Sequence, residues 1–380
     1  LKATCRCFFS ELVVDHSRWP PRRMGNEEEV FGSSNEAASQ PDDSSVDSGP
    51  PPVPSTVAGV YHVKESLGSG SYSVVHRGVN QDTNQEVAVK LEWVNAEKGR
   101  RLLAEARLYE RFTDSRGVPK VHWVGKQGPY NVVIMDLQGP SLDDHFSACW
   151  RRFTLKTVLM LAEQMIDRIE YVHSCGVMHR DIKPHNFLMG RGDERHRVFI
   201  MDFGLAKRYE DSRTGKHIVC TERSGVTGTV RYASLNVHAG VEPSRRDDLE
   251  AIGYVLMHFL RGALPWQGFK GGSKRAKHEK IRLAKQNASV EELCEGFPGE
   301  FESYFRHCRQ LKFADRPEYS RLRGLMRDVF VRERFERDWI YDWTDAEPSP
   351  PVARAEVGPR ERRSGRRRRG SPEGEPRQRK

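Results

Sequence analysis

The residues best suited to chemistry lie in one short stretch, residues 179–186, which reads HRDIKPHN. It places a carboxylate (Asp181), an amine (Lys183) and a carboxamide (Asn186) close together, and a second carboxylate, Asp202, follows 21 residues after the first in a DFG triplet. Phosphoryl transfer from ATP needs such a set, namely a base that orients a hydroxyl group and two oxygen ligands that hold Mg²⁺ on the phosphates. The HRD triplet (residues 179–181) or the DFG triplet (residues 202–204) alone is a weak signal. Their order and spacing together predict ATP- and Mg²⁺-dependent phosphoryl transfer.

The motif residues are expected to divide the catalytic work. Asp181, Lys183 and Asn186 form the predicted catalytic set, in which Asp181 accepts the proton of the attacking hydroxyl and Lys183 lies near the transferred phosphate. Asn186 and Asp202 are the predicted metal ligands, because Mg²⁺ prefers hard oxygen donors. His179 is predicted to be a hydrogen-bonded structural histidine rather than a base.

A glycine-rich stretch, residues 67–75 (LGSGSYSVV), could hold the phosphates. Gly68 and Gly70 would let backbone N–H groups approach phosphate oxygens without a Cβ in the way, although a plain β-turn explains two glycines equally well. The third glycine of the usual loop is replaced by Ser73, which reduces backbone freedom. Twenty residues after Gly70, Lys90 is the candidate partner of the α- and β-phosphates; a strand lysine that reaches solvent is the simpler alternative.

The surrounding pattern predicts a β-rich part followed by a helical part, with the motif loop at their junction. Short β-branched stretches predict strands over residues 60–67, 74–79, 86–91, 118–124 and 131–135, with a helix over 97–112. From Thr154, apolar residues recur at i, i+3, i+4 and i+7, which predicts a long amphipathic helix. Further helices are predicted over residues 246–261, 274–286, 300–311 and 319–334.

Composition divides the chain into three parts: a disordered arm over residues 1–58, one folded domain over 59–343, and a disordered tail over 344–380. Residues 25–55 carry seven acidic and no basic residues, whereas residues 346–380 carry eleven basic residues against five Glu. Unbalanced charge of this kind is typical of solvated segments. The seven cysteines show no metal-type spacing, and no run of eighteen apolar residues occurs, so we expect an intracellular protein without a membrane anchor.

Further segments resemble the casein kinase I family of serine/threonine protein kinases, over roughly residues 59–343. The resemblance is carried by residues 135–142 (MDLQGPSL), 153–159 (FTLKTVL), 186–190 (NFLMG), 244–250 (SRRDDLE) and 264–268 (LPWQG). Most telling is the stretch 227–236, TGTVRYASLN, because most kinases carry Ala-Pro-Glu at the end of this segment and the family carries a Ser-Ile-Asn variant.

The resemblance implies an α+β, bilobal protein kinase fold, with a small β-rich lobe, a larger helical lobe and ATP between them. Met135 would be the gatekeeper, the backbone of Asp136 and Leu137 would meet adenine, and Asp248 would brace the catalytic loop from below. Glu105 would hold Lys90. The implied ATP-binding residues are Leu67, Gly68, Ser69, Gly70, Val75, Ala88, Lys90, Glu105, Met135, Asp136, Leu137, Leu188 and Met201.

The resemblance also implies protein substrates with an acidic or phosphorylated residue upstream of the target Ser or Thr. Four basic residues match or adjoin the positions that bind this anion, namely Arg231, Lys277, Arg180 and Lys207. The usual alternative to an anion-binding role for a lone Arg or Lys is that it is a solvated surface charge. The chain lacks the family's basic residues at Thr221 and Ser224, for which Arg223 would partly compensate.

Two other classes of function stay open at this stage. A pseudokinase scaffold would bind partners without catalysis, and Ser73 is the residue that supports it. A nucleic-acid-binding protein would rest on the Arg-rich residues 362–369, whose contact with nucleic acid should be nonspecific because aromatic residues are missing. We expect a monomer in the cytoplasm, the nucleus or both, and residues 273–277 (SKRAK) resemble a stretch that the family uses for nuclear entry.

Overall fold

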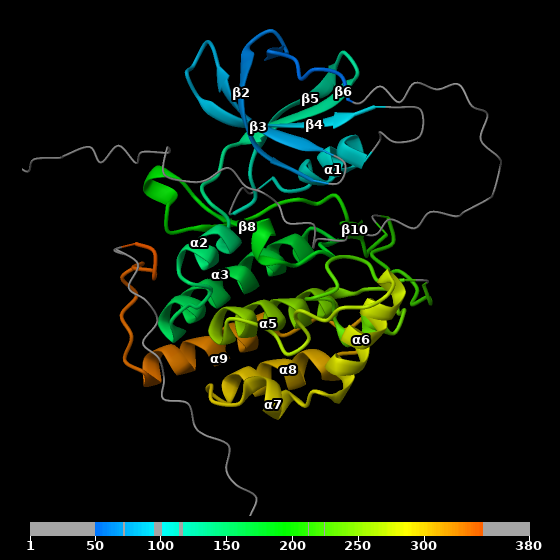
Figure 1. Ribbon diagram of the computed structural model, residues 1–380, viewed down its shortest axis with the longest axis vertical. Coiled ribbons are helices and arrows are strands. Elements are labelled where there is room, and N and C mark those ends of the chain that lie inside the picture. Colours follow the sequence, from blue (N-terminus) through cyan, green and yellow to red (C-terminus); the bar gives the residue numbers. More distant parts are fainter. Residues whose placement is uncertain are drawn as a thin grey trace, which may run out of the picture. The chain divides into compact units, whose positions relative to one another are not determined.

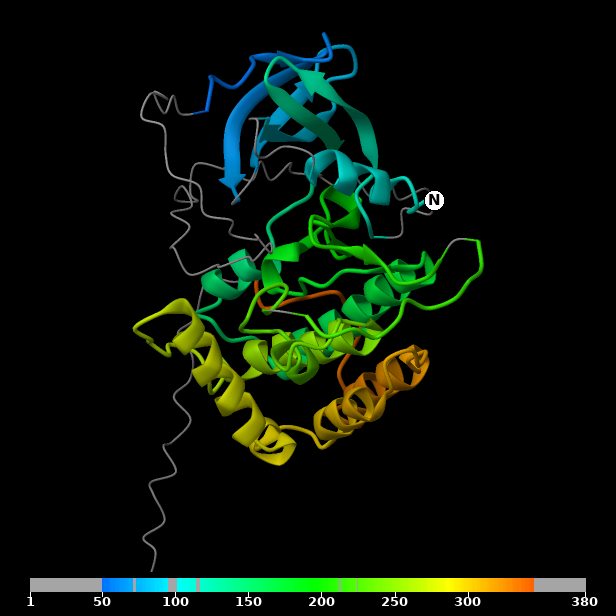
Figure 2. The same cartoon turned by 90° about the vertical axis from the view of Figure 1, so that its right-hand side faces the viewer.

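The computed structural model describes residues 50–70, 73–94, 101–113, 117–211, 213–223 and 225–344, and they form a β-rich part above a helical part (Figure 1). The β-rich part is one antiparallel sheet with strand order β1-β2-β3-β4-β6-β5. Its strands are β1 (Thr56–Val57), β2 (Tyr61–Ser69), β3 (Val74–Asn80), β4 (Glu86–Trp93), β5 (Val121–Gln127) and β6 (Tyr130–Asp136). Helix α1 (Arg101–Tyr109) packs beside this sheet (Figure 2).

The folded chain begins earlier than the sequence predicted. Strand β1 lies inside the stretch 1–58 that was expected to be disordered, yet it pairs with β2 through Val57 and Tyr61. Val57 is completely buried in the apolar cluster on the outer face of the sheet, which accounts for the order of this short strand. Residues 1–49 and 345–380, including the Arg-rich stretch, lie outside the described residues.

The helical part is built around two long helices, α3 (Leu155–Ser174) and α5 (Arg245–Arg261). Thr154 caps α3 by accepting a hydrogen bond from the Thr157 N–H, and the apolar stripe of α3 is buried as its periodicity predicted. Helix α5 is buried along almost its whole length and ends at Gly262, whose φ of +86° favours glycine. The other helices are α2 (Leu142–Ala148), α4 (Leu235–His238), α6 (Lys274–Asn287), α7 (Val290–Cys294), α8 (Glu300–Gln310) and α9 (Tyr319–Arg332).

Short elements between α3 and α4 carry the motif residues. Strand β7 (Val177–Met178) pairs with β10 (Lys207–Arg208), and β8 (Phe187–Met189) pairs with β9 (Val198–Ile200). The 3₁₀ turn η2 (Pro184–Asn186) directly precedes β8, and a second turn, η3 (Gly192–Glu194), joins β8 to β9. These two strand pairs therefore fix both ends of the stretch 179–186 and the start of the DFG triplet.

The chain after α9 packs back against α2 and the start of α3. Trp343 stacks on His145 with ring centroids 4.2 Å apart, and Asp342 accepts hydrogen bonds from the Thr154 N–H at 2.6 Å and the Thr154 hydroxyl at 2.7 Å. The folded domain therefore extends at least to this segment. In the part of the chain that the structure describes, no helix is both long and apolar enough to cross a membrane.

Candidate active site

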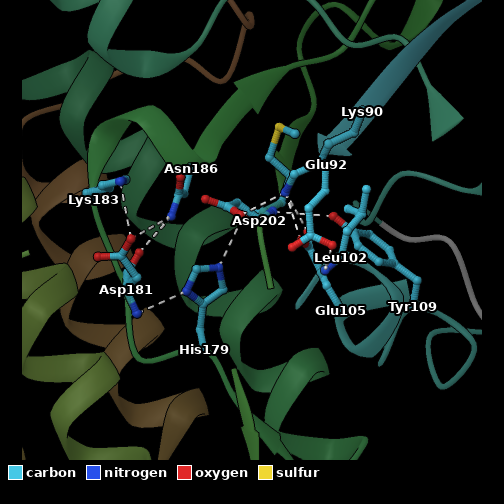
Figure 3. Close-up of polar contacts among 11 residues, drawn as sticks. Lys90, Glu92, Leu102, Glu105, Tyr109, His179, Asp181, Lys183, Asn186 and Asp202 are labelled. Atoms are coloured by element: carbon cyan, nitrogen blue, oxygen red, sulfur yellow. Dashed lines mark hydrogen bonds and ion pairs between the residues drawn. The ribbon is translucent and has the colours of Figure 1, made fainter. Parts of the chain in front are cut away.

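The amine of Lys90 joins the sheet to α1 and to the DFG triplet (Figure 3). It donates to both carboxylate oxygens of Glu105, at 2.9 and 2.8 Å, and to Asp202 Oδ1 at 3.0 Å. Burial works to lower the pKa of Lys90, but the charges of Asp202 and Glu105 outweigh it and raise the pKa above its usual range. The lysine is therefore charged and held in place, and does not reach solvent as a plain strand lysine would.

Asp202 is ionised and aimed into the same site. The charge of Lys90 lowers the pKa of Asp202 to about 2, with a further contribution from Lys183. The backbone of Asp202 is in the left-handed region, with a φ of +66°, and its N–H donates to the Tyr109 hydroxyl at 3.3 Å. A strained residue that is fixed by its neighbours in this way is typical of functional sites.

Asp181 lies in the catalytic loop and is held on both carboxylate oxygens. Its Oδ1 accepts from the Thr229 N–H at 2.9 Å and from the Thr229 hydroxyl at 2.8 Å, while Oδ2 lies 3.2 Å from Lys183 Nζ. The Asn186 amide donates to the backbone carbonyl of Asp181 at 2.9 Å. The structure therefore brings the three predicted catalytic residues together and adds Thr229, which the sequence analysis did not single out.

The two predicted metal ligands suit Mg²⁺. The amide of Asn186 is oriented by its bond to Asp181, which leaves the Asn186 side-chain oxygen as the atom for coordination, and Asp202 supplies a carboxylate. No group of three or more His, Cys, Asp or Glu side chains among the described residues is placed to hold a metal alone. Two oxygen ligands fit Mg²⁺, which usually keeps waters and binds substrate phosphates as well.

Asp248 of α5 supports the catalytic loop from beneath, as the resemblance implied. Its Oδ2 accepts from the His179 N–H at 2.8 Å and from His173 Nε2 at 2.9 Å, and its Oδ1 accepts from the Arg180 N–H at 2.8 Å. Burial opposes its charge, but the hydrogen bond from His173 and the other donors outweigh burial and lower the pKa of Asp248. Arg180 is held at a φ of +67°, an unfavourable conformation that these bonds stabilise.

His179 has the structural role that its sequence context predicted. Its Nε2 donates to the Met201 carbonyl at 3.1 Å, and its Nδ1 accepts from the Asp181 N–H at 3.2 Å, so both ring nitrogens are used. Its ring packs on Phe203 at 5.2 Å, and Phe203 in turn packs on Tyr109 of α1 at 5.1 Å. This aromatic stack connects α1 to the catalytic loop.

Most of the predicted nucleotide-binding residues lie on or beside the strands of the sheet, whereas Leu188 lies on β8 and Met201 directly follows β9. Ala88 and Met135 are buried and directly opposite each other in the β4–β6 register, whereas Leu67 is 39% exposed. Gly68, Ser69 and Gly70 are exposed or half-buried near the β2–β3 turn, and Val75, Leu137, Leu188 and Met201 are partly buried at the edge of the apolar core. The backbone N–H of Asp136 donates to the Lys120 carbonyl at 2.9 Å, so the predicted contact of this residue with adenine falls to its carbonyl oxygen.

Two of the predicted anion-binding residues gather on a carboxylate that the sequence analysis missed. Glu242 is 3% exposed and lies 3.0 Å from Lys207 Nζ, 3.0 Å from the Arg223 guanidinium and 3.6 Å from that of Arg180. Burial opposes the charge of Glu242, but the bonds from Lys207 and Arg223 outweigh it and lower its pKa. Ser224, the other position of interest in this segment, lies outside the described residues. A single buried carboxylate thus orders three basic side chains beside the catalytic loop.

The segment that carries Arg231 is held by three side chains from elsewhere. Lys285 of α6 donates to the carbonyls of Val230, at 3.0 Å, and Ala233, at 2.6 Å, while Trp266 Nε1 donates to the Arg231 carbonyl at 2.8 Å. His238 Nε2 lies 3.2 Å from the same Val230 carbonyl. The Lys285 amine also lies over the rings of Tyr254 and Trp266, at 4.7 and 5.0 Å.

Lys277, the fourth predicted anion-binding residue, lies near the start of α6 and is half-buried. The same helix therefore carries Lys277 on its first turns and the anchor Lys285 on its last. No sequence motif marked Lys285 or Glu242, because each acts through contacts with residues far away in the chain.

The site combines a held lysine, two carboxylates, an oriented asparagine and a fixed catalytic loop between a β-rich and a helical part. A family model described as protein kinase domain matches residues 61–326, well over half of the 380 residues. The chain therefore belongs to the protein kinase family, with the α+β fold and β-rich N-terminal part that the sequence predicted.

Proposed function

We propose that this protein kinase is an active serine/threonine kinase of the casein kinase I type, which transfers the γ-phosphate of ATP to acidic or phospho-primed proteins. The observation that carries the proposal is the ion pair between Lys90 and Glu105, together with the contact between Lys90 and Asp202. A pseudokinase scaffold has no need to keep a buried lysine paired with a buried glutamate and in contact with Asp202, because buried charges are costly.

The chain's own residues can position both reactants. Lys90 would bind the α- and β-phosphates, and Asp202 with the side-chain oxygen of Asn186 would hold Mg²⁺. The metal would neutralise charge that develops on the phosphate oxygens. Asp181 cannot rotate freely, since Thr229 and Lys183 contact its two oxygens. A fixed carboxylate can orient the substrate hydroxyl and accept its proton as the phosphate transfers.

The casein kinase I assignment is supported by the residues at the end of the activation segment. Ser234 and Asn236 replace the more common Ala-Pro-Glu pattern, and both donate to Asp247 Oδ1, at 2.6 and 3.2 Å. The segment before them is held by Lys285 and Trp266. The end of the activation segment is therefore held in place by these contacts without an Ala-Pro-Glu motif.

The preference for acidic or phosphorylated residues upstream of the target is supported by the surplus of positive charge near the loop. Arg180, Lys207 and Arg223 contribute three positive charges around Glu242, so the cluster keeps a net charge of about +2. Arg231 and Lys277 add two further basic side chains on the segment and helix nearby. A phosphate carries close to two negative charges and three acceptor oxygens, which suits such a surface.

The test of this function is phosphate transfer from γ-labelled ATP to casein by the purified 380-residue chain in the presence of Mg²⁺. We expect label on Ser and Thr after hydrolysis of the product. Lys90→Met removes the phosphate-binding amine and should abolish labelling. Glu86→Gln changes a carboxylate at the start of the same strand, which pairs with Arg77 and Arg191 rather than with Lys90, and should leave labelling intact. Labelling by the wild type that does not exceed that by Lys90→Met would contradict catalysis, and label on Tyr would contradict the substrate class.

A further inference from the structure

Strand β4 presents two buried charged side chains on one face. Lys90 and Glu92 are two positions apart, so they point to the same side of the sheet, and they are only 8% and 4% exposed. Lys90 binds Glu105 and Asp202 in the candidate active site. Glu92 belongs to none of the predicted catalytic, metal-binding or nucleotide-binding sets.

The carboxylate of Glu92 is bound to the first residues of the described α1. Its Oε1 accepts from the Arg101 N–H at 3.2 Å. Its Oε2 accepts from the Leu102 N–H at 3.2 Å (Figure 3). Oε2 also accepts from the Asn131 amide at 3.1 Å, and Asn131 lies directly opposite Glu92 in the β4–β6 register. A negative charge at this end of a helix interacts favourably with the helix dipole.

The two contacts between β4 and α1 are made at separate points along both elements. Lys90 and Glu92 are about 6.6 Å apart along the strand. Leu102 and Glu105, their partners on α1, are about 4.5 Å apart along the helix axis. Lys90 holds α1 near its middle and Tyr109 packs on Phe203 at its end, whereas Glu92 makes the polar contact between β4 and the first described residues of the helix.

We propose that Glu92 is a positioning residue that holds the beginning of α1 against β4 and thereby keeps Glu105 within reach of Lys90. The proposal rests on the proposed function, in which Lys90 binds the nucleotide phosphates. Without Glu92, the first described turn of α1 loses its polar contacts with β4 and shifts, Glu105 holds the Lys90 amine less well, and Lys90 is no longer fixed toward the phosphates. Binding of the adenine ring does not depend on this chain of contacts.

This difference between phosphate and adenine gives a direct test, in which Kd values for ADP and adenosine are measured by calorimetry. In Glu92→Leu, loss of a well-directed contact to a charged phosphate should raise Kd for ADP about tenfold or more, while Kd for adenosine stays within about twofold. Glu92→Gln keeps one acceptor oxygen and should show a smaller rise, of about threefold. Glu86→Gln, at the other end of β4, is the matched control and should leave both values unchanged.

A second measurement, backbone amide hydrogen exchange, reports on α1 itself. We expect faster exchange at residues 101–109 in both Glu92 variants and unchanged exchange in α3 and α5. If Glu92→Leu does not fold, Glu92→Gln alone decides the matter with the same two measurements. Equal weakening of ADP and adenosine, or wild-type ADP affinity with wild-type exchange in α1, would overturn the proposal. If wild-type protein binds ADP no more tightly than adenosine, the proposed function itself fails instead.

Discussion

Replacement of Asp248 by Asn removes one hydrogen-bond acceptor and the negative charge beneath the catalytic loop. The Asn oxygen can take the place of Oδ2 and keep the bonds from the His179 N–H and His173 Nε2. The Asn NH₂ group then faces the Arg180 N–H, which loses its acceptor. The substitution is nearly isosteric, so packing is preserved and the effect can be calculated from the hydrogen bonds.

The expected loss of stability is the sum of two effects. A buried N–H without a partner costs about 1–3 kcal/mol, and the loss of charge weakens the two remaining bonds by about 1 kcal/mol each. The free energy of unfolding should therefore fall by about 3–5 kcal/mol. A domain of ordinary stability, about 5–15 kcal/mol, would still be folded at 25 °C in most of this range.

The effect on catalysis should be selective. Arg180 is at a φ of +67° and directly precedes Asp181, so loss of its bond lets the base move. A displacement of about 1 Å can reduce the turnover number about a hundredfold. Nucleotide affinity should change little, because Lys90 and Asp202 do not contact Asp248.

The assays are urea unfolding followed by tryptophan fluorescence, steady-state kinetics and the Kd for ADP. Asp167→Asn is a matched control, because Asp167 is 45% exposed and pairs with Arg323 at 3.0 Å, a pair expected to contribute less than about 1 kcal/mol. An unfolding free energy of Asp248→Asn within 1 kcal/mol of wild type, with normal turnover, would refute the reasoning.

Three further predictions concern substrate choice, segment anchoring and pH. Substitution of Arg231 and Lys277 together by Ala should raise KM for primed or acidic peptides with little change for unprimed ones; an unchanged ratio of kcat/KM for a matched peptide pair would contradict this. Lys285→Met leaves the carbonyls that Lys285 binds without their amine donor, and should raise peptide KM about tenfold while Kd for ADP is unchanged. Burial lowers the pKa of His238 and of His258 to about 3, so only the unfolded chain takes up these protons near pH 6.5, and stability should fall by at most about 2 kcal/mol per histidine between pH 7 and 5. Urea unfolding at both pH values checks this, and His258→Phe should remove about half of that dependence.

The parts of the fold with strong local patterns could be predicted from the sequence. The stripe of apolar residues after Thr154 identified the start of α3 to within one residue, and short stretches rich in β-branched residues identified β2, β3 and β4. The short elements β1, β7, β10 and α4 could not be predicted, because two to four residues carry no detectable periodicity. Their order comes from tertiary contacts, as the complete burial of Val57 illustrates.

The same distinction applies to the site. Lys90, Asp181 and Asp202 stand in motifs whose spacing is set by the chemistry, so they are visible in the sequence. Glu92 and Glu242 act through partners that are close only in the folded chain, and an isolated Glu gives no sequence signal.

Asp181→Asn most directly tests the claim that this chain is an active kinase with Asp181 as its base. The measurement is single-turnover transfer from γ-labelled ATP to casein, with the Kd for ADP determined on the same preparations. The account predicts a fall in the transfer rate of about a hundredfold or more at unchanged ADP affinity, because Asp181 orients the hydroxyl and does not hold the nucleotide. Transfer by the folded Asp181→Asn protein at the wild-type rate would contradict the account.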